Sequence, residues 1–185
     1  MPNKIWVTSD LHLGHNREFL YGPRGFSHIQ EHDAAIVENW NELVAPDDEV
    51  YVLGDLMLMD NERGMRQLAR LNGNLHIVLG NHDTAERVHL YGTLPRTVEI
   101  ESGLPLKALG HRFYLSHYPS LVSNWDDGKP LRRGVINLCG HTHTNDPWLH
   151  ASLGRIYHVE LDAHNNKPAS LEKIIADMEK RYDTI

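Results

Sequence analysis

Two histidines stand two positions apart in the segment LCGHTHTND, which covers residues 138–146. A short apolar run ends at Gly140, and His141 and His143 follow it with one threonine between them. In an extended chain, alternate side chains point to the same side. The two imidazoles could therefore bind one ligand together, although two exposed residues of a turn would show the same spacing. Further candidate metal ligands elsewhere in the chain would favour a metal site over an exposed turn.

The same arrangement recurs at four other places, where a short apolar run is followed at once by Asp, Asn or His. The five runs and the residues that follow them are IWVTS with Asp10 and His12, VYVL with Gly54 and Asp55, LHIVL with Gly80, Asn81, His82 and Asp83, FYLS with His117, and VINLC with Gly140, His141 and His143. In open α/β sheets, ligands bind outside the carboxyl ends of the strands. Polar residues at the same end of five runs therefore predict one common site.

Seven of these residues offer oxygen or imidazole nitrogen and no thiolate; they are Asp10, His12, Asp55, Asn81, His117, His141 and His143. This mixture suits Mn, Fe or Zn, whereas sulfur-rich sites suggest structural zinc and all-oxygen sites suggest magnesium or calcium. Seven ligands are too many for one tetrahedral ion but suffice for two ions that share a carboxylate. In two-metal hydrolytic sites the ions lie about 3.5–4 Å apart. Histidines must be neutral to bind metal, so we expect the site to weaken in acid.

The composition is that of a globular protein, with 185 residues, 41% of them hydrophobic, and a formal net charge of -7. No broad basic surface for duplex nucleic acid is expected from this charge, although a nuclease is not excluded. Cys139 is the only cysteine, which excludes an internal disulfide and fits a reducing compartment. Neither a signal-peptide pattern nor an apolar run of 18 residues is present. We expect a soluble, cytoplasmic protein without a membrane partner, with residues 1–185 forming a single domain.

Short β-branched or apolar runs alternate with helical patterns along the chain. Strands are predicted at residues 5–9, 50–53, 75–79, 98–100, 106–109, 113–116, 135–139 and 156–161. A helix is predicted after a capping box of Ser27 and Gln30, a second one after Asp60 or Asn61, and a last one from Ser170. The alternation predicts an α/β layered domain with a buried sheet.

Taken in order, the blocks Asp-x-His, Gly-Asp, Gly-Asn-His-Asp, His and Gly-His-x-His resemble the calcineurin-like metallophosphoesterase superfamily. The blocks run from Asp10 to His143, about three quarters of the chain, and their combination is far more specific than any one of them. The WVTSDLHLGHN opening and the LSHYP block look most like a small bacterial or phage phosphoesterase branch of the superfamily. The resemblance implies an α/β four-layer sandwich, in which two mixed β-sheets are flanked by helices.

The resemblance also implies which residues hold two metal ions. One ion would be bound by Asp10, His12, Asp55 and His143, and the second by Asp55, Asn81, His117 and His141. Asp55 would thus bridge the two ions. No position of this set departs from the pattern of the superfamily.

Hydrolysis by such a site would use a hydroxide that bridges two divalent or mixed-valence ions, with manganese, iron or zinc expected. His82 is the candidate general acid, because it stands beside Asn81 without being needed as a ligand. Asp83 is expected to orient His82 and stabilise its charged form, and the resemblance assigns both residues these roles. Cys139 is expected to be a core residue, since no covalent intermediate is needed.

The expected substrate is a small phosphate ester or a nucleotide-like compound, with the end of a nucleic acid as a further possibility. Two divalent ions, two aspartates and one hydroxide sum to about +1, which a phosphodiester monoanion would neutralise. A phosphodiesterase is therefore favoured over a phosphomonoesterase. A binding protein that has lost catalysis is a third reading, and the retained His82 argues against it. His15, Asn16 and Arg17 follow the first block and are candidate substrate contacts, although a surface loop is an equal interpretation.

Overall fold

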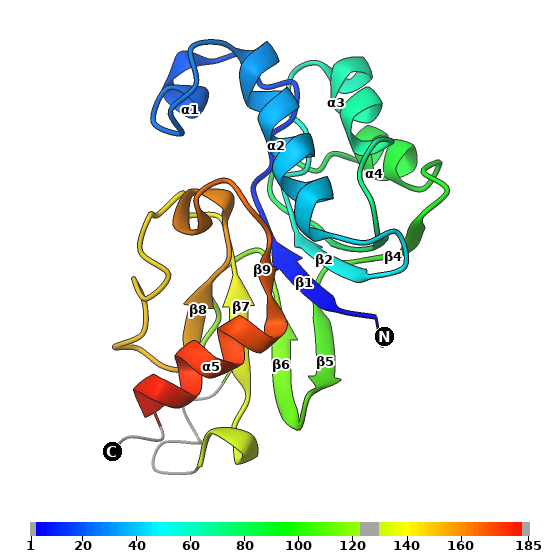
Figure 1. Cartoon of the computed structure of the whole chain (residues 1–185). Coiled ribbons are helices and arrows are strands. Elements are labelled where there is room, and N and C mark those ends of the chain that lie inside the picture. Colours follow the sequence, from blue (N-terminus) through cyan, green and yellow to red (C-terminus); the bar gives the residue numbers. More distant parts are fainter. Residues whose placement is uncertain (1–2, 123–129, 183–185) are drawn as a thin grey trace.

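Two mixed β-sheets pack against each other in the computed structural model, which describes residues 3–122 and 130–182 (Figure 1). The larger sheet has the strand order β4-β3-β2-β1-β9, and the smaller one has the order β5-β6-β7-β8. Strands β1 to β4 are parallel and β9 is antiparallel to β1, while β5 is antiparallel to β6 and the remaining pairs of the smaller sheet are parallel. The predicted α/β class with two mixed sheets is confirmed.

The strands are β1 (Ile5–Thr8), β2 (Glu49–Leu53), β3 (Asn74–Val78), β4 (Thr97–Glu101), β5 (Leu104–Ala108), β6 (His111–Leu115), β7 (Ile136–Cys139), β8 (Ile156–His158) and β9 (Ala169–Ser170). The α-helices are α1 (Glu18–Tyr21), α2 (Ile29–Leu43), α3 (Asn61–Leu68), α4 (Ala85–Tyr91) and α5 (Leu171–Tyr182). Within the described residues, the 3-10 helices are η2 (Leu131–Arg133) and η3 (Leu161–His164). None of the described helices is both long and apolar enough to cross a membrane.

The larger sheet is buried on both faces because its strands alternate between two apolar clusters. Trp6, Val52 and Ile77 pack with residues of α2, α3 and α4, among them the fully buried Trp40. Their sequence neighbours point the other way, as Val7 shows, and pack with the smaller sheet and α5. Figure 1 shows α2, α3 and α4 gathered on one side of the larger sheet and α5 lying across the smaller one. The helices therefore flank the two sheets, as predicted.

The carboxyl ends of β1, β2 and β3 and those of β6, β7 and β8 meet in one place. The backbone of Ser9 pairs with that of Glu160 in an isolated parallel bridge, which joins the end of β1 to the chain leaving β8. The amide of Gly140 donates to the carbonyl of His117 at 3.0 Å, and the amide of Asp10 donates to Gly54 at 3.0 Å. The polar residues that follow the strands are thus brought together from both sheets.

Several local predictions need correction. Helix α2 begins one residue later than the predicted capping box, because the side chain of His28, not of Ser27, accepts from the amide of Glu31 at 3.1 Å. The short helices α1 and α4 were not predicted, although Thr84 caps α4. Of the two caps predicted for α3, Asp60 or Asn61, the structure has Asp60, whose side chain accepts from the amide of Arg63 at 2.9 Å. The prediction that Ser170 precedes α5 is confirmed.

Gly73 illustrates how closely the helix layer packs on the larger sheet. Its φ is +93°, and an added Cβ would lie 2.6 Å from Cγ2 of Val50 and 3.0 Å from Cγ1 of Val44. Gly110 also has a positive φ, +78°, but a Cβ there would meet nothing within 4 Å. The pair separates backbone strain from steric overlap.

We predict that Gly110→Ala lowers the free energy of unfolding by about 1 kcal/mol, the cost of placing alanine in the left-handed region. Gly73→Ala adds overpacking and should lose roughly 1–3 kcal/mol more. Urea denaturation of both variants measures the difference. Equal losses for the two variants would show that the contacts of Gly73 do not constrain the core.

Candidate metal centre

Five of the seven predicted metal ligands have a left-handed backbone conformation. The φ angles are 57° at Asp10, 50° at His12, 56° at Asp55, 77° at His141 and 50° at His143. Residues other than glycine rarely adopt positive φ, and such conformations persist mainly where surrounding structure imposes them, often at functional sites. The turns that follow three different strands thus share one unfavourable conformation, which directs their side chains into a common volume.

The first group of side chains comes from Asp10, His12 and His143. Nε2 of His12 lies 3.1 Å from Nε2 of His143 and 3.8 Å from Oδ1 of Asp10, and the last two atoms are 3.7 Å apart. Two atoms bound to one cation at about 2.1 Å each lie roughly 3 to 3.5 Å from one another. The distance between the two histidine nitrogens lies in this range and the two distances to Asp10 are slightly longer, so the group is close to the spacing of ligands around one ion.

A second group lies beside it and consists of Asn81, His117 and His141. Oδ1 of Asn81 lies 2.9 Å from Nε2 of His117 and 2.9 Å from Nδ1 of His141, and the two nitrogens are 3.1 Å apart. Nδ1 of His117 lies 2.8 Å from the carbonyl oxygen of Leu53, which fixes the ring with Nε2 turned toward the group.

Asp55 stands between the two groups. Its Oδ2 lies 3.8 Å from Nε2 of His12 in the first group and 3.7 Å from Nε2 of His117 in the second. Its Oδ1 accepts a hydrogen bond from the amide of His82 at 2.9 Å, so that the carboxylate is held in this orientation. One oxygen of Asp55 is therefore within reach of ions in both positions.

Glycine precedes the candidate ligands because the carboxylates press against the backbone. A Cβ at Gly80 would lie 2.2 Å from Oδ1 of Asp55, and a Cβ at Gly140 would lie 2.3 Å from Oδ2 of Asp10. Any larger residue would displace the carboxylate that defines the site. The glycines of the blocks Gly-Asn-His-Asp and Gly-His-x-His are thus explained by close approach.

The buried polar atoms fit bound cations. Oδ1 of Asp10 is buried and has no hydrogen-bond partner, while Oδ2 accepts from the amide of His141 at 2.9 Å. An unpartnered buried carboxylate oxygen is costly unless a cation satisfies it. Asp10, His12 and His143 offer atoms that all lie within 4.8 Å of one another, and so do Asp10, Asp55 and His117. The residues present therefore suit a metal centre.

The matching family model decides the identity of the chain: it describes the calcineurin-like phosphoesterase superfamily domain and matches residues 4–154. The chain belongs to this superfamily. It is a metal-dependent phosphoesterase, a hydrolase that acts on phosphate esters, and the superfamily is typically dinuclear. The resemblance seen in the sequence is thereby confirmed.

Curated relatives of the phosphoesterase include an uncharacterized protein of Methanocaldococcus jannaschii, which is 32% identical and covers 96% of this chain and 92% of its own length. The gene 66 protein of Mycobacterium phage D29 is 30% identical, with 96% and 98% covered. Among solved structures, a protein of unknown function from Aquifex aeolicus has a TM-score of 0.71 at 23% identity and covers 94% and 98% of the two chains. A novel archaeal phosphodiesterase has a TM-score of 0.51 at 16% identity, covering 85% and 82%.

The electrostatics of the site favour a charged carboxylate at Asp10 and neutral rings at His12 and His141. Burial alone would raise the pKa of Asp10, but its contacts with His12, His143 and His117 outweigh burial and hold the pKa at about 2. Burial lowers the pKa of His12 to about 4, and burial together with His117 lowers the pKa of His141. Both rings are therefore neutral near pH 7, which is the form that binds metal. Burial raises the pKa of Asp55, and a neighbouring cation would oppose that effect.

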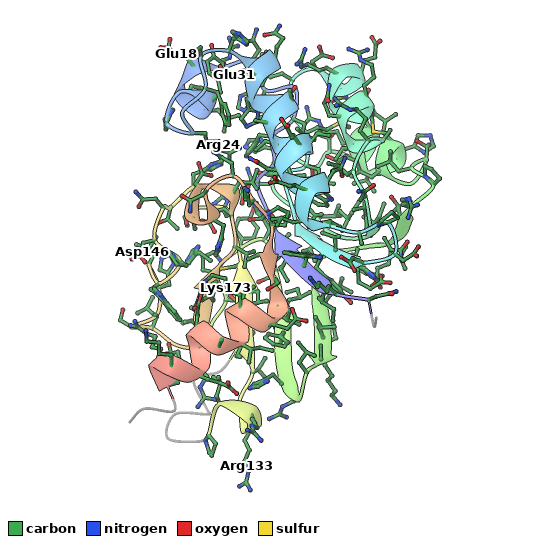
Figure 2. All side chains as sticks on the ribbon, viewed as in Figure 1. Glu18, Arg24, Glu31, Arg133, Asp146 and Lys173 are labelled. Atoms are coloured by element: carbon green, nitrogen blue, oxygen red, sulfur yellow. The ribbon has the colours of Figure 1, made fainter. Side chains whose placement is uncertain are left out.

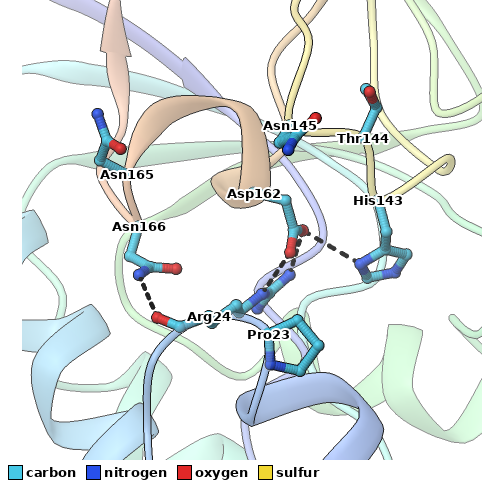
Figure 3. A pocket seen from close by; sticks show the side chains of 8 residues that line it. All are labelled: Pro23, Arg24, His143, Thr144, Asn145, Asp162, Asn165 and Asn166. Atoms are coloured by element: carbon cyan, nitrogen blue, oxygen red, sulfur yellow. Dashed lines mark hydrogen bonds and ion pairs between the residues drawn. The ribbon is translucent and has the colours of Figure 1, made fainter.

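Two residues that contact the candidate site, Asp162 and Arg24, were missed in the sequence. Oδ2 of Asp162 lies 3.1 Å from Nδ1 of His143, so that the carboxylate orients the ring whose Nε2 faces the first group. Burial lowers the pKa of His143, but the hydrogen bond to Asp162 and the negative charges of Asp10 and Asp162 together outweigh burial, and the net shift of the pKa is upward. Arg24 holds Asp162 in turn through Nε at 3.0 Å and Nη2 at 2.7 Å (Figure 3). Carboxylates that support metal-binding histidines in this way tune metal affinity.

Arg24 also ties the first strand end to this support. Its Nη2 donates to the carbonyl of Asp10 at 2.8 Å and its Nη1 to the carbonyl of Leu11 at 3.3 Å. Figure 2 shows Arg24 between the α1–α2 region and the loops beyond the smaller sheet, whereas Glu18 and Glu31 lie at the outer edge. Arg24 lies in the loop of residues 22–28 before α2. The loop thus supplies a buried guanidinium group that stabilises the positions of Asp10 and Asp162 at the candidate centre.

A signal for Asp162 was present in the sequence but was not recognised. The run IYHVEL is a sixth apolar run followed directly by an acid. Arg24 had no comparable signal, since the partners of its side chain are 8 to 138 residues away. Tyr118 was missed as well: its half-exposed ring lies 5.1 Å from that of His117 and 4.7 Å from that of His141.

His82 lies at the rim of the centre, with 44% of its side chain exposed and its Nε2 3.9 Å from Oδ2 of Asp55. Asp83 has other partners than the expected ring of His82. Its Oδ2 accepts from the amides of Asp55 at 2.9 Å and Gly80 at 2.8 Å, and its Oδ1 accepts from the hydroxyl of Tyr91 at 2.7 Å. Asp83 therefore joins the loop of Asp55 to the loop of Gly80. None of its described hydrogen bonds goes to the ring of His82.

The three candidate substrate contacts are placed differently. His15 is buried and its ring lies 5.5 Å from that of His12, in the wall of a cavity beside the centre. Asn16 and Arg17 are exposed and do not line this cavity. The structure thus brings only His15 of the three to the candidate site.

The shared position of Asp55 generates a prediction about metal content. Asp55→Asn should weaken both sites by at least the roughly 10- to 100-fold that loss of a supporting carboxylate costs. Asp162→Asn contacts only the first group and should weaken one site by about that amount. Asp47→Asn, an exposed loop position, is the control.

Isothermal titration of metal-stripped protein with Mn²⁺ measures both affinities. Two unchanged sites in Asp55→Asn would contradict the shared position, whereas loss of both sites in Asp162→Asn would contradict the separation of the two groups.

Proposed function

We propose that the protein is a dinuclear metal-dependent phosphodiesterase with His82 as its general acid. The observation that supports it best is the position of Oδ2 of Asp55, 3.8 Å from His12 and 3.7 Å from His117. One carboxylate oxygen that faces two separate groups of candidate ligand atoms can bridge two ions at the short separation of two-ion hydrolytic centres.

In the proposed centre, Asp10, His12, Asp55 and His143 hold one ion, and Asp55, Asn81, His117 and His141 hold the other. Imidazole, amide and carboxylate ligands suit manganese, iron or zinc. The ligands come from the ends of strands in both sheets, so we propose that residues 1–185 act as one catalytic domain. When bound, the ions supply Lewis-acid activation of the phosphate and a nucleophile from water at neutral pH.

The residues of the chain have complementary roles. The neutral rings of His12 and His141 leave their lone pairs free for ligation, and Asp162 keeps Nε2 of His143 directed at the centre. His82 is held by its own backbone, whose amide donates to Oδ1 of Asp55 at 2.9 Å. Its partly exposed ring can therefore reach the substrate without taking a ligand position and can donate a proton to the leaving oxygen.

Charge supports a diester as substrate. Two divalent ions, the two carboxylates of Asp10 and Asp55 and one hydroxide leave a net charge of about +1, which matches a diester monoanion. Arg24 and Asp162 form an ion pair at 2.7 Å beside the centre and add no net charge. The archaeal phosphodiesterase that shares this fold is consistent with the proposal.

His82→Ala tests the acid directly. The variant should keep its metal and lose about 10²–10⁴-fold in kcat on a diester with a poor leaving group, where protonation matters most. His89→Ala, at an exposed position of α4, is the matched control and should behave as the wild type. Wild-type turnover of His82→Ala on such a substrate would remove His82 as the acid.

Add-back of metal tests the function as a whole. Metal-stripped protein is assayed on bis(p-nitrophenyl) phosphate and on p-nitrophenyl phosphate, with Mn, Fe(II), Zn and Mg supplied separately. The proposal expects cleavage that depends on Mn, Fe(II) or Zn and is faster on the diester. Faster cleavage of the monoester would assign a phosphomonoesterase, and silence on both esters with two bound ions would contradict a general phosphodiesterase.

A further inference from the structure

We propose that the leaving group of the substrate carries a flat ring system, such as the aryl group of a phenol or the base of a nucleoside, which stacks on Phe19 in an apolar cavity beside His82. This inference rests on the proposed phosphodiesterase function and names the chemistry of one half of its substrate.

The cavity opens next to the metal centre and has a volume of about 580 Å³. This lies within the range of sites that enclose small organic ligands, about 300–1,000 Å³. Phe19, Leu20 and Leu58 give its wall an apolar surface, and His12 and His143 connect it to the first group of candidate ligands. A substrate whose phosphate lies at the centre can therefore extend an organic group into this space.

Phe19 is an apolar residue of this wall whose exposure to solvent is not explained by packing within the protein. Its side chain is 73% exposed, although the other lining residues Leu20 and His15 are buried. The ring meets His15 edge-on, with centroids 5.6 Å apart and an interplanar angle of 84°. Its position in the wall offers an uncovered aromatic surface to a planar group. Stacking on such a surface is strong and is available to any base or aryl ring.

His82 determines which half of the substrate enters this cavity. The proposed acid lines the same cavity as Phe19, and an acid must stand beside the oxygen that leaves. The group attached to the leaving oxygen therefore lies on the side of His82, against Phe19.

The space on the other side of His143 and Asp162 has a different character. A second cavity of about 430 Å³ is lined there by polar side chains; they include Arg24, Thr144, Asn145, Asn165 and Asn166 (Figure 3). Such a surface suits hydroxyl or amide groups rather than an apolar ring. No lysine or arginine is among the described residues that line the Phe19 cavity, so a leaving group with further phosphates is disfavoured there. Of the two cavities, only the Phe19 cavity therefore suits an uncharged ring.

Two chromogenic diesters separate the leaving half from the other half. Bis(p-nitrophenyl) phosphate carries two rings, whereas methyl p-nitrophenyl phosphate carries one, on the leaving oxygen. Metal-loaded Phe19→Ala should lose roughly 5- to 100-fold in kcat/KM on both substrates, mainly through KM, as expected for a lost stacking partner. Phe19→Trp keeps an aromatic surface and should stay within about threefold of the wild type. Val98→Ala, at another exposed apolar side chain, on β4, is the control.

The outcomes are distinct. A loss confined to bis(p-nitrophenyl) phosphate would place the non-leaving ring on Phe19 and overturn the inference. Unchanged kinetics of Phe19→Ala on both diesters would overturn it too, while the hydrolysis itself would leave the proposed phosphodiesterase standing. A metal-loaded wild type that cleaves neither diester would overturn both. Because Phe19 is exposed, its replacement should leave the thermal unfolding midpoint unchanged, which verifies that the variant is folded.

Discussion

The metal centre depends on the left-handed backbone at the residues that leave the strands. Each such residue costs roughly 1–2 kcal/mol relative to an ordinary conformation, and Asp10, His12 and Asp55 all adopt it. Backbone hydrogen bonds beyond the strand ends hold these residues in that conformation. The amide of Asp10 donates to the carbonyl of Gly54 and the amide of His12 donates to the carbonyl of Asp55, both at 3.0 Å. The sheet therefore imposes conformations that these residues would not choose, and the turned side chains converge because of it.

Convergence has a second cost that a cation can remove. Nε2 of His12 and Nε2 of His143 lie 3.1 Å apart, and Oδ1 of Asp10 is buried without a partner. The two nitrogens lie closer together than nitrogen atoms do without a proton or an ion between them, and Oδ1 of Asp10 lies 3.8 and 3.7 Å from them. Asp162 and Arg24 hold this arrangement from outside through hydrogen bonds of 2.7 to 3.1 Å. Backbone strain, unpartnered ligand atoms and the buried ion pair thus all support one metal-binding function.

The sequence was sufficient for what is local. Strand ends followed by Asp, Asn or His predicted that the ligands meet, because parallel strands bring their carboxyl ends to one edge. It was insufficient for contacts between distant segments: Arg24 and Asp162 are 138 positions apart, and only the folded chain joins them. Asp83 is a second example. Because it follows His82 in the sequence, we expected the two side chains to pair, but the carboxylate of Asp83 instead accepts from the hydroxyl of Tyr91 and from two loop amides. At α2 the error was smaller, because His28 can cap a helix as serine does.

The most direct test of the two-ion account is anomalous diffraction from crystals of the protein grown with Mn²⁺. The account predicts two anomalous peaks about 3.5–4 Å apart, both in contact with the carboxylate of Asp55. One peak should lie among Asp10, His12 and His143, and the other among Asn81, His117 and His141. A single peak at saturating metal, or two peaks of which only one touches Asp55, would contradict it.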